Sequence, residues 1–287
     1  MRYDVKARPN LRSRVRGKHF IHRWYEKSWA SELFSETHCH LTRLNQDALG
    51  RAIAQAQKSG IELVLNAGGD PESSKLAIQN AREHPVIKAC VGLHPWNAGR
   101  YSDEVLERLR ELVRHPQVVA VSEIGLDYVG RMSSEGKFVN EFADKEIQRN
   151  AFREQLNIAK KSGLPVIVHD RTPGQEVLDI LEEEGSVATG VAIHGFSKDS
   201  TYAKRCVDMG IYLSIGLRSI SSQDNEALKE TVKQIPLSWL LTETDSQNPE
   251  GVLTVAKKIA ELKGLSTEHV GLTTTQNLRK LIRQHAH

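Results

Sequence analysis

Histidines and carboxylates recur in this chain at the ends of short runs of β-branched and apolar residues. Glu123 lies in Ser-Glu-Ile-Gly-Leu-Asp-Tyr, and Asp245 ends Thr-Glu-Thr-Asp. Imidazole nitrogens and carboxylate oxygens bind divalent cations, and burying them together is costly unless a cation compensates their charge. The pattern therefore predicts a metal centre. The histidines that follow such runs are His38, His40, His94, His169 and His194.

The number of these groups bears on the kind of metal centre. A single tetrahedral zinc ion uses three protein ligands and keeps one position for water. Four imidazoles and two carboxylates suit two ions about 3.5–4 Å apart that share a carboxylate, activate water and hold a phosphoryl oxygen. We therefore predict two divalent metal ions (Mg²⁺, Mn²⁺ or Zn²⁺) and hydrolysis of a phosphodiester.

Covalent catalysis finds less support in the sequence. The chain contains no Gly-x-Ser-x-Gly motif, which would indicate a serine nucleophile. Cys39 lies between His38 and His40, but alternate residues of a strand point to opposite faces. We therefore expect both histidines to face the metal centre and Cys39 to point away from it.

The elements that must position these groups also repeat. From residue 32 onwards, strand-like runs alternate with segments of helical periodicity, which predicts a parallel sheet with helical crossovers. Eight such units favour a closed (β/α)8 TIM-type barrel, in which reactive groups lie at the carboxyl ends of the strands. An open dinucleotide-binding sheet is less favoured, because no Gly-x-Gly-x-x-Gly follows the first run. The runs are Leu33–His40, Ile61–Ala67, Val86–His94, Val118–Leu126, Pro165–His169, Val191–His194, Ile211–Ile215 and Trp239–Thr244.

The composition is that of an ordinary globular protein. Of the 287 residues, 39% are hydrophobic and 26% charged, and the apolar runs are too short to span a membrane. The three cysteines, Cys39, Cys90 and Cys206, are widely spaced, which is typical of a reducing compartment. We expect a cytoplasmic protein with no membrane association and no obligatory protein partner.

Charge divides the chain into two parts. Residues 1–28 contain nine Lys or Arg and two acidic residues, a net charge of +7, so the total of +3 leaves −4 for the remainder. The segment has no apolar core of the kind found in secretory signals. We interpret residues 1–31 as a basic, poorly ordered extension and residues 32–287 as the hydrolase barrel. A nucleic-acid-binding arm is the alternative reading of the extension.

Taken in order, one to a strand end, these motifs resemble those of the TatD family of metal-dependent deoxyribonucleases, a branch of the amidohydrolase-like barrels. The resemblance runs from about Glu36 to Leu281. It implies that His38, His40 and Asp245 hold the first ion, that Glu123 bridges, and that the second ion is held also by His169 and His194. The matching stretches are Thr37–Leu41, Gly92–Pro95, Glu123–Tyr128, Leu164–Arg171, His194–Phe196, Thr242–Asp245 and Asn277.

The resemblance also implies roles around the metals. Asp245, counted with Glu123 and His94 as catalytic, would accept a proton from the attacking water, and His94 would also contact the substrate. The planar guanidinium of Arg171 is suited to phosphate, with an ion pair to a nearby carboxylate as the alternative. Trp96 and Tyr128, just beyond strand ends, are candidates for stacking on bases, with loop packing as the alternative.

The chain departs from the family pattern at three places. Glu36 stands where the family usually has Asp, which could alter the support of the first metal. The loop after Asp245 is short and lacks the usual arginine, which predicts a more open site. Residues 129–146, by contrast, form a longer polar segment than usual, and we expect it to act as a lid.

The sequence is compatible with two enzymatic functions and with one non-catalytic function. The favoured one is a nuclease or phosphodiesterase acting on single-stranded DNA or RNA. The alternative is an amidohydrolase-like hydrolase of a small ester, lactone or amide, since a fold does not fix a substrate. A non-catalytic role fits poorly with six metal-ligand candidates. Aromatic faces beside Lys or Arg at the site would indicate nucleic acid, and a closed apolar pocket would indicate a small acyl substrate.

Overall fold

The computed structural model describes residues 34–132, 138–139, 143–172 and 174–283. The predicted extension, residues 1–31, lies outside the described residues, so its interpretation stays a prediction. None of the helices in the described part of the chain is both long and apolar enough to span a membrane.

Eight parallel strands form one sheet in the order β1-β2-β3-β4-β7-β8-β9-β10. Its last strand returns to the first, because the Asp245 amide donates to the His38 carbonyl (3.0 Å) and the His40 amide to the Ser246 carbonyl (2.8 Å). The predicted TIM barrel is therefore confirmed. The strands are β1 (Phe34–Cys39), β2 (Ile61–Ala67), β3 (Ile87–Val91), β4 (Val118–Asp127), β7 (Val166–Arg171), β8 (Val191–His194), β9 (Ile211–Gly216) and β10 (Leu240–Glu243).

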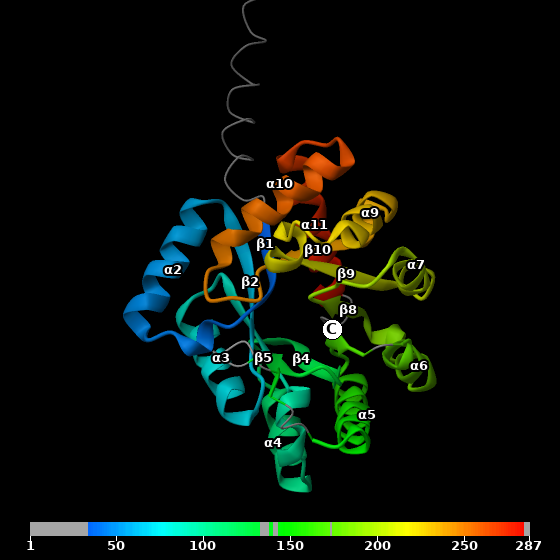
Figure 1. Ribbon diagram of the computed structural model, residues 1–287. Coiled ribbons are helices and arrows are strands. Elements are labelled where there is room, and N and C mark those ends of the chain that lie inside the picture. Colours follow the sequence, from blue (N-terminus) through cyan, green and yellow to red (C-terminus); the bar gives the residue numbers. More distant parts are fainter. Residues whose placement is uncertain (1–33, 133–137, 140–142, 173, 284–287) are drawn as a thin grey trace, which may run out of the picture.

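Helices surround the ring of strands (Figure 1). Their ends follow ordinary capping chemistry: Asp70 accepts from the Ser73 amide before α3, and Gly163 ends α5 with a left-handed φ of 63°. The helices are α2 (Gln46–Lys58), α3 (Pro71–Glu83), α4 (Asp103–Leu112), α5 (Lys145–Ser162), α6 (Glu176–Glu183), α7 (Ser200–Asp208), α8 (Leu217–Ser221), α9 (Glu226–Gln234), α10 (Val252–Lys263) and α11 (Thr267–Arg283).

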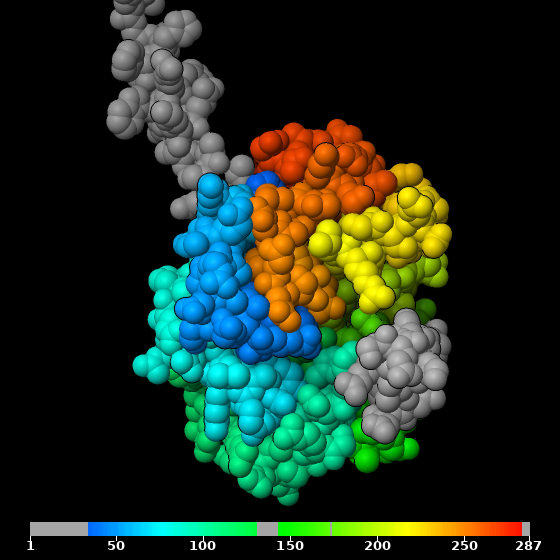
Figure 2. Space-filling view, turned by 60° about the vertical axis from the view of Figure 1, so that its left-hand side comes forward, coloured from blue at the N-terminus to red at the C-terminus, as the bar shows by residue number. Residues whose placement is uncertain are grey.

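Short 3₁₀ turns link several of these elements: η1 (Leu41–Arg43), η2 (Pro95–Arg100), η3 (Ser186–Thr189), η4 (Leu237–Trp239) and η5 (Pro249–Gly251). Figure 2 shows the blue residues of α2 beside the orange residues of η5 and α10. Glu250 joins these two regions by accepting hydrogen bonds from Gln55 (2.9 Å) and Ser59 (2.6 Å). Elements more than 190 positions apart in sequence thus close the outer layer around the barrel.

The strands bury side chains on both faces. Apolar residues such as Leu65 and Ile167 fill the barrel, where Leu278 and Leu281 of α11 pack against them. A larger cluster lies between the strands and the outer helices, and it includes Cys39, which points away from the barrel interior as the strand alternation predicts. Helix α11 therefore covers one end of the barrel interior. The barrel of the described chain is open at the other end, where the strands have their carboxyl ends.

The structure corrects two details of the sequence analysis. Strand β3 ends at Val91 rather than at His94. At Gly92 the chain passes so close to β4 that a Cβ atom there would lie 2.5 Å from the Ser122 carbonyl oxygen, and His94 instead caps η2.

In segment 129–146, β5 (Arg131–Met132) and β6 (Phe138–Val139) pair as antiparallel strands, which the sequence analysis does not predict. Residues 133–137 and 140–142 of the expected lid lie outside the described residues.

Candidate metal centre

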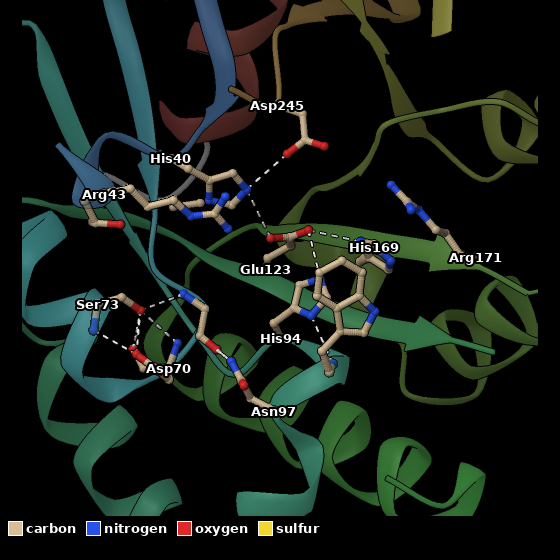
Figure 3. A pocket seen from close by; sticks show the side chains of 14 residues that line it. His40, Arg43, Asp70, Ser73, His94, Asn97, Glu123, His169, Arg171 and Asp245 are labelled. Carbon is tan, nitrogen blue, oxygen red and sulfur yellow. Dashed lines mark hydrogen bonds and ion pairs between the residues drawn. The ribbon is translucent and has the colours of Figure 1, made fainter. Parts of the chain in front are cut away.

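Glu123 of β4 is the carboxylate on which the imidazoles converge (Figure 3). Its Oε1 lies 2.8 Å from His194 Nε2 and 3.0 Å from His169 Nδ1. His94 Nε2 lies 3.2 Å from the same oxygen. These side chains come from β4, β8, β7 and the start of η2, so the barrel brings together residues spread over 100 positions of sequence.

The second oxygen of Glu123 faces a separate group. Glu123 Oε2 lies 3.4 Å from His38 Nε2 and 3.8 Å from His40 Nε2, both at the end of β1. Asp245, two residues beyond β10, places Oδ1 3.0 Å from His40 Nε2 and 3.9 Å from His38 Nε2. Glu123 thus stands between two sets of donor atoms, one at each of its oxygens.

The donor atoms fit divalent cations. Both ring nitrogens of His38 are buried without a hydrogen-bond partner among the described residues, and its side chain is 0% exposed. Such unsatisfied nitrogens are costly unless a ligand takes them up. Burial lowers the pKa of His38 and favours the neutral imidazole, which is the form that binds metal. Three groups of side chains have ligand atoms within 4.8 Å of one another: His38 with His40 and Asp245, His38 with Glu123 and His194, and His94 with Glu123 and His169.

Both carboxylates are held in the charged form. Burial alone raises the pKa of Glu123, but the nearby imidazoles of His94, His38 and His194 outweigh it and hold the pKa well below its usual range. Burial also raises the pKa of Asp245, and the hydrogen bond with His40 reverses that effect. Ionised carboxylates at neutral pH are what a cation site requires.

Asp127 contacts His169 on the side of the ring opposite Glu123. The residue is buried, and its Oδ2 lies 2.9 Å from His169 Nε2 and accepts from Trp96 Nε1 at 2.9 Å. Its Oδ1 accepts from the amides of Val129 (2.9 Å) and Gly130 (2.7 Å). The contact with Nε2 leaves His169 Nδ1 directed at Glu123, the arrangement by which an outer carboxylate orients a metal-binding histidine.

Replacing Asp127 by Asn should weaken metal binding about 10–100-fold, because one amide oxygen cannot accept from all four donors. Isothermal titration of the metal-free protein with Mn²⁺ or Zn²⁺ measures this directly. Trp96→Phe is the matched control, since it removes the indole donor and leaves the contact between Asp127 and His169 in place. Unchanged metal affinity in Asp127→Asn would show that His169 is oriented without it.

Glu243 plays the corresponding part for His194. Its Oε1 accepts from the Gly195 amide at 2.6 Å and lies 3.4 Å from His194 Nδ1. Burial lowers the pKa of His194, but the charges of Glu123 and Glu243 outweigh this and raise it. Within the described chain no hydrogen bond joins Glu243 to Asp245, so Glu243 orients His194.

The metal centre opens into a cavity of about 640 Å³. His40, His94, Glu123, His169 and Asp245 form part of its wall. Trp96 lies beside them, with its ring 4.7 Å from that of His94. The cavity is therefore lined by ligand-type and polar groups, and it lacks the closed apolar wall expected for a small acyl substrate.

Known proteins similar to this chain are metal-dependent hydrolases, as the geometry of the site indicates. The family described as TatD related DNase matches residues 36–283. The chain is 34% identical to the uncharacterized metal-dependent hydrolase YabD of Bacillus subtilis, over 86% of this chain and 98% of that one. It belongs to the TatD family. As such it is a metal-dependent hydrolase of the amidohydrolase superfamily.

Other TatD relatives have more specific names. The human deoxyribonuclease TATDN3 is 31% identical over 86% of this chain and 93% of its own length. The 3'-5' ssDNA/RNA exonuclease TatD of Cronobacter turicensis is 32% identical over 68% and 70% of the two chains. Among solved structures, the TatD homologue YJJV of Escherichia coli superposes with a TM-score of 0.77 at 26% identity, covering 87% of this chain and 98% of that one.

The departures from the TatD pattern have structural counterparts. Glu36 is buried, and its Oε1 accepts from the amides of His38 (2.9 Å) and Thr244 (3.1 Å). It therefore ties together the backbones that carry His38 and Asp245. After Asp245, only residues 246–248 precede η5, so the loop is as short as the sequence indicates.

Only some of the residues predicted to contact substrate line the cavity of this TatD chain. Arg171 and Trp96 line the cavity, whereas Tyr128 is not part of its described wall. The Tyr128 ring lies against Lys145, whose Nζ is 4.6 Å from the ring centre, and packs on the outer core. The stacking role predicted for Tyr128 is therefore not supported, and loop packing accounts for its position. Arg43, which the sequence analysis did not select, also lines the cavity.

Proposed function

We propose that this TatD-family hydrolase cleaves phosphodiester bonds of single-stranded nucleic acid. The observation that carries the proposal is the wall of the cavity, where Trp96 and the guanidinium groups of Arg43 and Arg171 accompany the ligand cluster. Arginine suits phosphate, and an aromatic face suits a base. The human relative is a deoxyribonuclease and the Cronobacter relative a 3'-5' ssDNA/RNA exonuclease, which supports the same substrate class.

The proposal divides the ligands between two ions. His38, His40 and Asp245 would hold one ion, His169 and His194 the other, and Glu123 would be shared by both. Two bound divalent ions of this kind supply Lewis acidity and lower the pKa of water. The protein's own contribution is to fix these side chains and to place the reacting groups around them.

In this proposal Asp245 accepts the proton of the attacking water. Its side chain is 38% exposed, the most exposed of the candidate ligands, and its lowered pKa keeps it ionised. In the same proposal His94 holds a phosphate oxygen. Its Nδ1 accepts from the Trp96 amide at 3.0 Å, so in the neutral ring the proton lies on Nε2, which faces Glu123 and the cavity.

The decisive experiment supplies metal-free protein with Mg²⁺, Mn²⁺ or Zn²⁺ and end-labelled single-stranded DNA or RNA, with EDTA as the control. We expect cleavage that depends on the metal and is abolished by EDTA. Parallel assays with aryl esters, lactones and N-acyl amides test the alternative substrate class. Turnover of those substrates without any phosphodiester cleavage would overturn the proposal.

A further inference from the structure

Several cations around the mouth of the described barrel are already paired. Arg100 lies 3.1 Å from Asp70, and Lys198 lies 3.2 Å from Asp170. Arg149 of α5 pairs with both Glu146 and Glu176. These side chains serve the structure of the loops, and their charge is largely neutralised where it stands.

Arg43 and Arg171 differ from that group. Both are exposed and line the cavity, and neither side chain makes an ion pair or hydrogen bond with any residue the structure describes. For Arg171, the alternative of a structural ion pair therefore finds no described partner. Two uncompensated guanidinium groups facing one cavity favour an anionic ligand.

The barrel sets these two arginines apart. Arg43 follows β1, and Arg171 ends β7, which is the fifth strand of the eight in the ring. The two strands are therefore on opposite sides of the barrel. Figure 3 shows the same arrangement, with Glu123 between the two arginines. A single compact anion at the metal centre would leave this separation unexplained.

We propose that Arg43 and Arg171 bind the phosphates on either side of the one that is cleaved. The inference rests on the proposed function and specifies its substrate as an internal stretch of a single strand. The strand then crosses the mouth of the barrel from β1 to β7, with the reacting phosphate at Glu123. Phosphate contacts of this kind fix the register of the strand and are indifferent to base sequence.

Four short substrates test this register: TpT, pTpT, TpTp and pTpTp, which add a terminal phosphate on the 5′ side, the 3′ side or both. Each added phosphate should raise kcat/KM of the wild-type enzyme by about tenfold or more, the range expected for hydrogen bonds to a charged group. Arg43→Ala should lose the advantage of one terminal phosphate and keep the other, and Arg171→Ala should do the reverse.

Arg218→Ala is the matched control, because Arg218 is also exposed, makes no ion pair or side-chain hydrogen bond with any described residue and follows β9, yet is not part of the cavity wall. It should keep both advantages. Equal losses in all three variants would show diffuse attraction and overturn the proposal, as would retention of both advantages in Arg43→Ala. Metal content measured for each variant excludes a damaged metal centre as the cause.

Binding provides a readout that does not depend on cleavage. In EDTA, affinity for a labelled oligothymidylate should fall with salt, and each arginine variant should reduce the slope by about 0.7 units per lost phosphate contact, the value for a single strand. An unchanged slope in Arg43→Ala and Arg171→Ala would overturn the inference. If the loaded wild-type enzyme cleaves no phosphodiester, the proposed function fails, while the slopes still decide whether the arginines bind phosphates.

Discussion

Replacing Asp245 by asparagine is expected to lower turnover at least about 100-fold while most of the bound metal is retained. The carboxylate that would accept the water's proton becomes an amide, which is a far poorer base, but one ligand oxygen remains. Asp245 has a left-handed φ of 52°, a conformation that Asn also tolerates well. The loss therefore cannot be attributed to the backbone.

Rates measured alongside metal content decide the role of Asp245. His169→Ala is the contrasting variant, since it should lose activity together with one of the ions. Ser246→Ala, which keeps the backbone carbonyl that accepts from His40, should behave like wild type. If metal-replete Asp245→Asn turns over at close to the wild-type rate, Glu123 or His94 becomes the candidate proton acceptor.

Replacing Glu123 by glutamine should have the widest effect on the metal centre. Five imidazole nitrogens lie within 3.8 Å of its two oxygens, so one substitution removes negative charge from both ligand sets. We expect bound metal to fall from about two ions per chain to about one or fewer, and turnover to fall by roughly three orders of magnitude or more. Elemental analysis and steady-state rates measure the two effects.

Glu243→Gln is the matched control for that experiment. Glu243 is also a buried carboxylate beside His194, but it contacts the nitrogen that faces away from Glu123. Its loss should weaken metal binding or activity only about 10–100-fold. A Glu123→Gln enzyme that keeps two ions and turns over within tenfold of wild type would contradict a shared carboxylate.

The sequence was sufficient to predict the barrel and the side chains that meet in it, because both follow from local patterns. Strand-like runs with period-two alternation define which residues face inwards, and the (β/α)8 topology brings their carboxyl ends to one face. His38, Glu123 and Asp245 are more than 80 residues apart in sequence, yet they lie together in the structure.

Contacts made by loops could not be predicted in the same way. Asp127 belongs to the matching stretch Glu123–Tyr128, but its contacts with His169 and Trp96 depend on how β4, β7 and η2 pack against one another. Arg43 belongs to a three-residue turn with no periodicity to indicate where its side chain lies. The position of Tyr128 after β4 is compatible with base stacking and with loop packing, and only the structure shows its ring against Lys145.

The packing of α11 against the barrel interior determines how a long polymer can be handled. Leu278 and Leu281 pack on the side chains that fill the barrel, so the described chain provides no tunnel from one end to the other. A strand that enters at the carboxyl ends must leave by the same side, and no described element encircles it. We therefore expect the enzyme to act distributively, releasing a long strand between successive cuts rather than threading it.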